Sequence, residues 1–330
     1  MEIAGQARRK DCAAVEGSRM VQAKNYRSSR SRQSKSQLFN FTRDSYLERT
    51  SRPICAILFL LPFIIFYEIG TFRINTNILN QSQIRVVAFV WLQNLLESLG
   101  FGGKFAWAAP PLAVVVILLA LQITSGKQWR IWVGDFLPMA AECVLLAVPL
   151  IVLTLFLNSS PRPQSRHAAL NGGQPLVQRQ YQATACAATG GQSPSASESP
   201  RAAGTPNRSL WADVVTGIGA GIYEELIFRL ILICLLMLLF QDALRLSHKS
   251  AAVLSVLISA ALFSAHHHVD LLTGQPNLTD PFNLTRFAFR TIAGIYFAAL
   301  FAIRGFGITA GTHASYNIIA VSITSHFFQQ

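Results

Sequence analysis

Residues that could carry out chemistry stand close together in the sequence GIYEELIFRL at positions 221–230, where two glutamates and an arginine interrupt an apolar stretch. In a helix of 3.6 residues per turn, Glu225 and Arg229 share one face, with the acid N-terminal to the base, so they can neutralise each other. Glu224 points about 100° away from Glu225 and has no such built-in partner. Glu224 is therefore the candidate reactive carboxylate, able to activate a water molecule.

Two later apolar stretches carry histidines. In ALFSAHHHVD (261–270), Phe263 and His267 are four residues apart, and His267 has a histidine on each side. In TAGTHASYNII (309–319), His313 and Asn317 are four residues apart and share a helical face. A carboxylate, a histidine that can act near neutral pH, and a paired His and Asn supply a water activator and an oxyanion stabiliser for hydrolysis.

Membrane helices must position these side chains. Hydrophobic residues make up 51% of the chain and charged residues 13%, and the apolar residues gather in blocks, which is typical of an all-α, multi-pass membrane protein. A spanning helix needs about 20 apolar residues, and about seven stretches approach this length. They are roughly Pro53–Gly70, Phe105–Thr124, Phe136–Leu157, Ala212–Phe240, Ser250–His267, Phe287–Ile303 and Gly305–Phe328. The stretch Ile84–Leu99 is shorter and more polar, and it predicts a helix that lies at the membrane interface.

A long segment without apolar periodicity divides these spans. Residues 158–209 are rich in Ser, Gly, Pro and Gln, which predicts a disordered linker. The linker separates a three-span part (53–157) from a four-span part (210–330), and residues 1–52 form a basic head that we expect to be disordered. The active site is expected in the four-helix C-terminal part, because all the dense polar motifs lie there. Three glycines stand just before the glutamates: Gly217, Gly219 and Gly221. They predict a thin helix face that another helix can approach closely.

The positive charge of the chain is local. The formal net charge is +12, but twelve of the 28 lysines and arginines lie at or before Arg52. This basic head lacks interleaved aromatic residues and precedes a span, so the positive-inside rule accounts for it and we expect no nucleic-acid partner. The five cysteines form no C-x-x-C pair, which argues against a disulfide framework or a zinc knuckle.

The motifs E-E-x-x-x-R, F-x-x-x-H and H-x-x-x-N follow in this order on successive motif-bearing helices. This set resembles the CAAX protease and bacteriocin-processing family of intramembrane proteases, also called CPBP or Abi. The resemblance covers about a third of the chain, from Trp211 to Asn317, and the sequences YEELIFR and RGFGITAGTHASYN look especially like bacterial members. It implies an intramembrane endopeptidase in the bacterial inner membrane that hydrolyses a membrane-associated protein or peptide.

The resemblance also implies a role for each matching residue. Glu224 and His267 would hold and polarise the attacking water. His313 and Asn317 would stabilise the oxyanion of the tetrahedral intermediate. The supporting residues would be Glu225 and Arg229.

Two features of this implied site stay open. Since three histidines are consecutive, a slip of one residue would put His266 in the place of His267. The family was long described as metalloproteases, but the resemblance favours a glutamate mechanism without an obligatory metal, with zinc as the alternative. The substrate, its prenylation and the oligomeric state do not follow from the sequence.

Other interpretations compete with a protease. The charges on the first motif helix could form a buried ion-pair network that only fixes helix packing, and His313 and Asn317 could be interhelical hydrogen-bonding residues. His268, at a helix end, could belong to a solvated cluster. Glu142 is a further intramembrane acid without a partner four residues away, and no role is assigned to it. A transporter could use the charges as an ion relay, and a non-catalytic immunity-type protein could bind a peptide.

Overall fold

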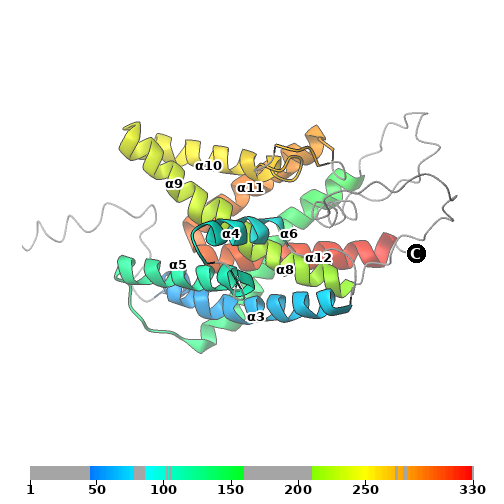
Figure 1. The fold of residues 1–330 in the computed structure, drawn as a ribbon, viewed down its shortest axis with the longest axis horizontal. Helices are drawn as coiled ribbons and strands as arrows, with labels where there is room; N and C mark the ends of the chain where they lie inside the picture. The colour runs from blue at the N-terminus through cyan, green and yellow to red at the C-terminus, as the bar shows by residue number, and fades with distance from the viewer. Residues whose placement is uncertain are drawn as a thin grey trace, which may run out of the picture. The chain divides into compact units, whose positions relative to one another are not determined.

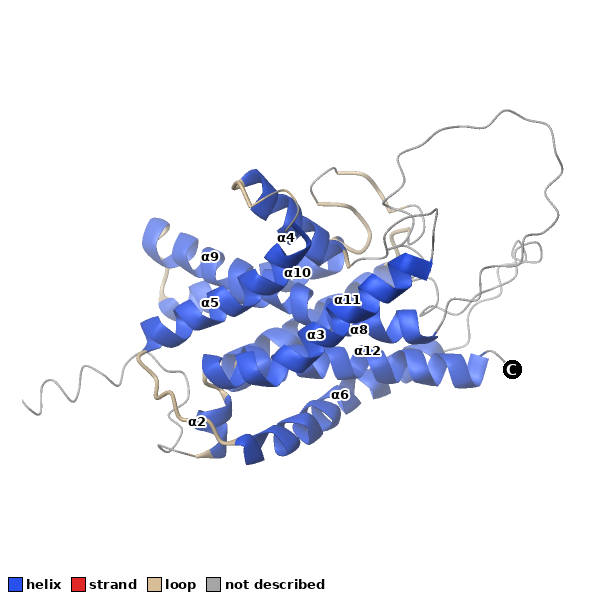
Figure 2. Ribbon diagram, turned by 60° about the horizontal axis from the view of Figure 1, so that its bottom comes forward, coloured by secondary structure: helices blue, strands red, loops and turns tan. Residues whose placement is uncertain are grey.

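The computed structural model describes residues 45–77, 86–101, 103, 106–159, 210–271, 274–277 and 281–328. Within these ranges the regular secondary structure is helical, as Figure 2 shows, and only the pair Val269 and Pro276 forms a β-bridge. The predicted all-α fold class is therefore confirmed. Residues 1–44 of the predicted head, residues 160–209 of the predicted linker, and Ile84, Arg85 and Phe105 at two predicted helix starts lie outside the described residues.

Six helical stretches are long and apolar enough to cross a membrane. They are Pro53–Ile74, Ala106–Ser125, Val133–Leu157, Leu210–Ala243, His248–Ala265 and Leu284–Arg304. Each overlaps one of the predicted spans. The seventh predicted span forms α12 (Phe306–Phe328), which is not among the six, because its Thr, His, Ser and Asn residues lower its hydropathy.

The N-terminal part contributes a short helix, three long ones and one of intermediate length. These are α2 (Tyr46–Thr50), α3 (Pro53–Asn77), α4 (Val87–Ser98), α5 (Ala109–Ser125) and α6 (Phe136–Ser159). The helix α4 is the one predicted to lie at the interface. It buries Ala88, Phe89 and Leu92 and is too short to span a bilayer.

In the C-terminal part, one long helical stretch switches from α-helical to π-helical winding twice. It consists of α8 (Leu210–Glu225), the π-helical η3 (Leu226–Leu232), α9 (Ile233–Leu238) and the π-helical η4 (Leu239–Ala243). The first change follows directly on the two glutamates, and π-helical turns inside α-helices are frequent at functional sites. The chain then forms α10 (His248–Ala265), α11 (Leu284–Arg304) and α12.

Local sequence fixes where these last helices begin and end. The side chain of Ser247 accepts a hydrogen bond from the backbone N–H of Ser250 and caps α10, and the side chain of Asn283 caps α11 in the same way. Gly305 has a φ of 76° and is the single residue between α11 and α12. A residue with positive φ, which glycine adopts without steric cost, lets the chain turn directly from one helix into the next at this position.

The helix α8 lies against both α12 and α3, as Figure 1 shows, and the predicted glycine face makes this possible. A Cβ atom at Gly221 would lie 2.5 Å from the backbone nitrogen of Ala314 on α12, and one at Gly217 would lie 3.0 Å from the Cβ of Asn317. Gly219 faces the ring of Tyr67 on α3. The expected close helix approach at the acidic motif is therefore present, and it brings the backbones of α8 and α12 together.

A layer of ion pairs joins α2 to the ends of other helices. Glu142 on α6 binds Arg304 at the end of α11, with distances of 2.5 and 2.6 Å, and accepts a hydrogen bond of 2.8 Å from the hydroxyl of Tyr46. Arg49 makes two bonds of 2.9 Å to the carboxylate of Asp135. Glu142, to which no role was assigned from the sequence, is thus a structural acid whose partner is distant in the sequence.

Candidate active site

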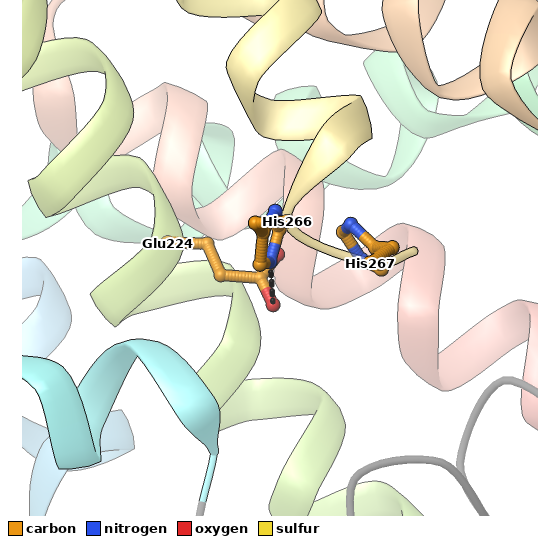
Figure 3. Close-up of side chains that lie close together, drawn as sticks. All are labelled: Glu224, His266 and His267. Carbon is orange, nitrogen blue, oxygen red and sulfur yellow. Dashed lines mark ion pairs between the residues drawn. The ribbon is translucent and has the colours of Figure 1, made fainter. Parts of the chain in front are cut away.

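Glu224 lies at a junction of three helices, near the end of α8. Its Oε1 is 3.9 Å from Nε2 of His266, which follows α10, and its Oε2 is 3.9 Å from Nε2 of His313 on α12. Figure 3 shows Glu224 and His266 facing each other, with His267 to the side on the segment after α10. Both distances are too long for direct hydrogen bonds, so a small group such as a water molecule can bridge each pair.

One backbone carbonyl orients two of the three consecutive histidines. The carbonyl oxygen of Phe263 is 2.5 Å from Nδ1 of His266 and 2.9 Å from Nδ1 of His267. A carbonyl oxygen can only accept a hydrogen bond, so Nδ1 of each ring carries the proton and Nε2 has a free lone pair. The F-x-x-x-H spacing assumed that the helix continues to His267, but α10 ends at Ala265 and the histidines lie in a turn.

The predicted pair of Glu225 and Arg229 is present and includes a third residue. Nε of Arg229 is 3.1 Å from Oε2 of Glu225, and Oε1 of Glu225 is 2.7 Å from Nδ1 of His313. Glu225 is fully buried at 0% exposure. The guanidinium of Arg229 also lies over the ring of Phe263, 4.1 Å from its centroid. The carboxylate of Glu225 therefore links α8 to α12 and fixes the orientation of the His313 ring.

The imidazole nitrogens that face Glu224 are hydrogen-bond acceptors. With Nδ1 of His313 donating to Glu225, Nε2 of His313 presents a lone pair towards Glu224. Nε2 of His266 does the same from the other side. The carboxylate of Glu224 also accepts, so three acceptors converge, an arrangement that is complementary to a group with protons to donate or to a cation.

Asn317 lies one turn after His313 on α12, as its spacing predicted. Its side-chain nitrogen donates a hydrogen bond of 3.0 Å to the backbone carbonyl of Gly217 on α8. An Asn side-chain nitrogen carries two protons, so one remains for a ligand while the other fixes the amide. The absence of a side chain at Gly217 makes room for this contact.

His268 does not lie in a solvated cluster, and that interpretation of it was wrong. Its side chain is 2% exposed, and its Nε2 is 3.3 Å from a guanidinium nitrogen of Arg290 on α11. Its ring lies next to those of Phe282 and Phe287, with centroids 5.4 and 6.4 Å away. The backbone N–H of Asn277 donates a hydrogen bond to the carbonyl of His268, beside the bridge between Val269 and Pro276.

Two aromatic residues next to the site were not recognised in the sequence. The ring centroid of Trp91, on α4, is 5.7 Å from that of His266, and the ring of Phe228 is 4.8 Å from the same imidazole. Phe228 falls within the first motif, between Glu225 and Arg229, and its apolar character gave no signal. Trp91 belongs to a helix more than 100 residues earlier in the chain, so no local spacing could have placed it here.

A metal ion is a second chemical possibility at this site. Among the described residues, Glu224, His266 and His267 each offer a ligand atom, and these atoms lie within 4.8 Å of one another. One carboxylate and two imidazoles make up a ligand set that catalytic zinc sites use. The carbonyl of Phe263 also accepts hydrogen bonds from the other ring nitrogen, Nδ1, of His266 and His267, and metal-ligating histidines are commonly held by such a carbonyl. The residues therefore fit a divalent cation, which would act there as a Lewis acid.

Fold and site together define a multi-pass integral membrane protein with a glutamate and histidine site within its helical core. The family model described as type II CAAX prenyl endopeptidase Rce1-like matches residues 206–319, about a third of the chain. This segment includes all three motifs, and the predicted resemblance to the CAAX protease family is thereby confirmed. No curated protein and no solved structure matched the chain.

Proposed function

We propose that this protein is an intramembrane endopeptidase that hydrolyses a peptide bond of a membrane-associated protein or peptide. The observation that carries the proposal is the convergence of Glu224, His266 and His313 around a space that a water molecule can bridge. The match of residues 206–319 to CAAX endopeptidases supports the same reaction class. In this proposal residues 210–330 form the catalytic part, and residues 53–157 pack around it.

The attacking water is held between the carboxylate of Glu224 and Nε2 of His266, both of which accept hydrogen bonds. As the water oxygen attacks the peptide carbonyl carbon, one proton passes to this pair, which acts as the general base. The same proton is then delivered to the nitrogen of the leaving amine when the C–N bond breaks. Burial of the site keeps bulk water from competing with the positioned molecule.

The developing oxyanion is stabilised by His313 and by the second N–H of Asn317. Nδ1 of His313 is bonded to Glu225, so in this proposal the neutral ring takes up a second proton from solvent at Nε2 before the water attacks, and this N–H donates to the oxyanion. The carboxylate of Glu225 stabilises that positive ring, and Arg229 holds the carboxylate in place. Glu225 and Arg229 thus support the site without touching the substrate.

The spacing from Phe263 favours His267 as the partner of Glu224, whereas the 3.9 Å approach favours His266. In our proposal His266 shares the water with Glu224, and His267 serves as the third ligand if a metal is bound. Comparing His266→Ala with His267→Ala tests this assignment. Greater loss of kcat in His266→Ala supports it, and greater loss in His267→Ala assigns the role to His267.

A packing network without catalysis would explain the pair of Glu225 and Arg229 and the bond from Asn317 to Gly217. It does not explain Glu224, whose carboxylate faces two imidazole nitrogens at 3.9 Å instead of a closely bound cation. A buried network that served packing alone would be expected to satisfy its acid directly. Glu224 is therefore the residue that separates the proposals.

The experiment is cleavage of membrane-anchored peptides, with and without a prenyl group, by purified protein in detergent. The variants are Glu224→Gln, which keeps the size of the side chain, and Glu97→Gln, the same change at an exposed glutamate outside the site. Activity that is lost in Glu224→Gln and kept in Glu97→Gln supports the proposal. Full activity in Glu224→Gln, or no cleavage by folded wild-type protein across a broad peptide set, contradicts it.

Chelation then distinguishes the two chemical forms of the site. Activity that persists in excess chelator supports the water held by Glu224 and His266 alone. Activity that is lost in chelator and restored by zinc, together with zinc binding that is lost in His267→Ala, would assign Glu224, His266 and His267 as metal ligands.

A further inference from the structure

The helix α4 brings two aromatic side chains from the N-terminal part of the chain onto the helix that carries Glu224. Phe89 packs edge-on against Tyr223, with ring centroids 4.9 Å apart, and Trp91 packs against Phe228 with centroids 6.5 Å apart. Tyr223 and Phe228 precede and follow Glu224 along the same helical stretch. Thus α4, which lies outside the family-matched segment, covers the part of α8 and η3 at which the reactive carboxylate is placed.

The position of α4 is fixed by its own buried face. Val86, Ala88, Phe89 and Leu92 are all buried, and the ring of Phe89 also contacts Tyr67 on α3. The side chain of Trp91 projects from this anchored helix and is only partly buried. A rigid helix with a bulky aromatic side chain can hold a neighbouring ring more precisely than a flexible loop can.

The imidazole of His266 is enclosed by rings. Phe228 and Phe263 lie 4.8 and 5.6 Å from it, His267 lies 3.9 Å from it, and Trp91 lies 5.7 Å away in an edge-on arrangement. Three of these four rings come from η3 or from the chain around the end of α10, within the segment that also carries His266 or Glu224. Trp91 is the only one of these four rings that comes from the N-terminal part of the chain. It covers a side of the imidazole that the other three rings do not.

A single hydrogen bond at Nδ1 does not determine the orientation of an imidazole. The bond to the carbonyl of Phe263 restrains the ring at one edge only. Packing against Phe228 and Trp91 removes this freedom and keeps Nε2 directed at Oε1 of Glu224, 3.9 Å away. The hydrogen bond and the ring contacts together therefore determine the orientation of the His266 imidazole.

We propose that Trp91 is a positioning residue of the active site, which holds the imidazole of His266 so that its Nε2 faces Glu224. The inference rests on the proposed function, because only a reaction that uses His266 gives this orientation a kinetic effect. It also means that the site is completed by α4, outside residues 206–319.

The test compares Trp91→Leu and Trp91→Phe with a control, Trp211→Leu. Trp211 also packs edge-on against a ring, that of Phe66, with centroids 5.0 Å apart, but none of its ring contacts is with His266 or His267. Loss of a supporting group around a catalytic residue typically costs 10- to 100-fold, so we expect kcat of Trp91→Leu to fall about tenfold, with KM close to that of the wild type. Trp91→Phe keeps an aromatic ring and should recover most of kcat, and Trp211→Leu should leave both constants unchanged.

A second measurement does not depend on activity. Diethyl pyrocarbonate modifies accessible imidazoles, and fragment mass spectrometry resolves the three consecutive histidines. The rate of modification of His266 should rise severalfold in Trp91→Leu and stay at the wild-type value in Trp91→Phe and Trp211→Leu.

Unchanged kcat and unchanged modification of His266 in Trp91→Leu would overturn the proposal. A change in KM alone would also overturn it, since it would show that Trp91 contacts the substrate. If the wild-type protein cleaves no peptide, the proposed function fails, and the modification rate of His266 still decides whether Trp91 positions this ring.

Discussion

Removal of the carboxylate of Glu225 should destabilise the protein more than any other single change at the site. This side chain is fully buried and binds two partners, Arg229 at 3.1 Å and His313 at 2.7 Å. Glu225→Met removes the charge and keeps much of the volume. It leaves the buried guanidinium of Arg229 without its ion-pair partner and Nδ1 of His313 without its acceptor.

The magnitude follows from these two losses. Breaking a buried ion pair by removing one partner costs about 3–5 kcal/mol. An unsatisfied buried donor costs about 1–3 kcal/mol, part of which is already counted in the first figure. We therefore expect a loss of about 4 kcal/mol for Glu225→Met, which corresponds to a decrease in Tm of about 6 °C for a protein of this size.

The double variant Glu225→Met/Arg229→Met separates the ion pair from the bond to His313. Replacing both members of a buried pair by apolar residues is often neutral or stabilising, so the double variant should recover most of the lost stability. The deficit that remains, about 1–3 kcal/mol, is the unsatisfied Nδ1 of His313. Peptide cleavage should stay low in the double variant, since the His313 ring has lost its anchor.

Thermal unfolding of the wild type, Glu225→Met, Arg229→Met and the double variant measures these effects. All four are compared in one detergent at one scan rate, because membrane proteins often unfold irreversibly. A wild-type Tm in Glu225→Met would refute the buried pair. A double variant that is destabilised by the sum of the two single changes would show that Glu225 and Arg229 do not interact. Recovery of both stability and full activity in the double variant would contradict the role of Glu225 in orienting His313.

Three further changes test other parts of the structure. Gly221→Ala places a Cβ 2.5 Å from the backbone nitrogen of Ala314 and should destabilise the protein by about 1–3 kcal/mol, whereas Gly134→Ala, with nothing within 4 Å, should change stability by less than about 0.5 kcal/mol. Glu142→Ala leaves Arg304 without its carboxylate and should lower the free energy of unfolding by about 3 kcal/mol. Glu97→Ala, at an exposed site on α4, should lower it hardly at all. Equal effects of the two changes would contradict the stabilising role of the ion pair between Glu142 and Arg304. Burial, together with the hydrogen bond to Glu142, raises the pKa of Tyr46 above its ordinary value of about 10, so the stability that the protonated hydroxyl contributes is present below pH 10 and is lost as the pH rises through the raised pKa. Tyr46→Phe should therefore show a shallower loss of Tm than the wild type above about pH 10, and parallel curves would disprove this linkage.

The residues of the motifs E-E-x-x-x-R and H-x-x-x-N could be recognised in the sequence because each of these two motifs lies within one continuous helical stretch. The pairing of Glu225 with Arg229 needs only the repeat of an α-helix, and the shared face of His313 and Asn317 follows in the same way. Apolar stretches of sufficient length predicted the membrane helices, and the three glycines predicted the close approach of α12 to α8. These properties are local, so they can be predicted without knowledge of the fold.

Contacts between distant segments could not be obtained in this way. Glu142 and Arg304 are 162 residues apart, and no periodicity relates them. Trp91 meets His266 only because α4 packs across α8. The sequence also could not show which histidine faces Glu224, since the four-residue spacing from Phe263 assumes a continuous helix and α10 ends at Ala265. The sequence thus determined the membrane helices and the residue types of the site, through helical periodicity and hydropathy. The packing of the helices and the turn after α10 decided how those residues face one another, because these depend on the positions of segments that the chain brings together only when it folds.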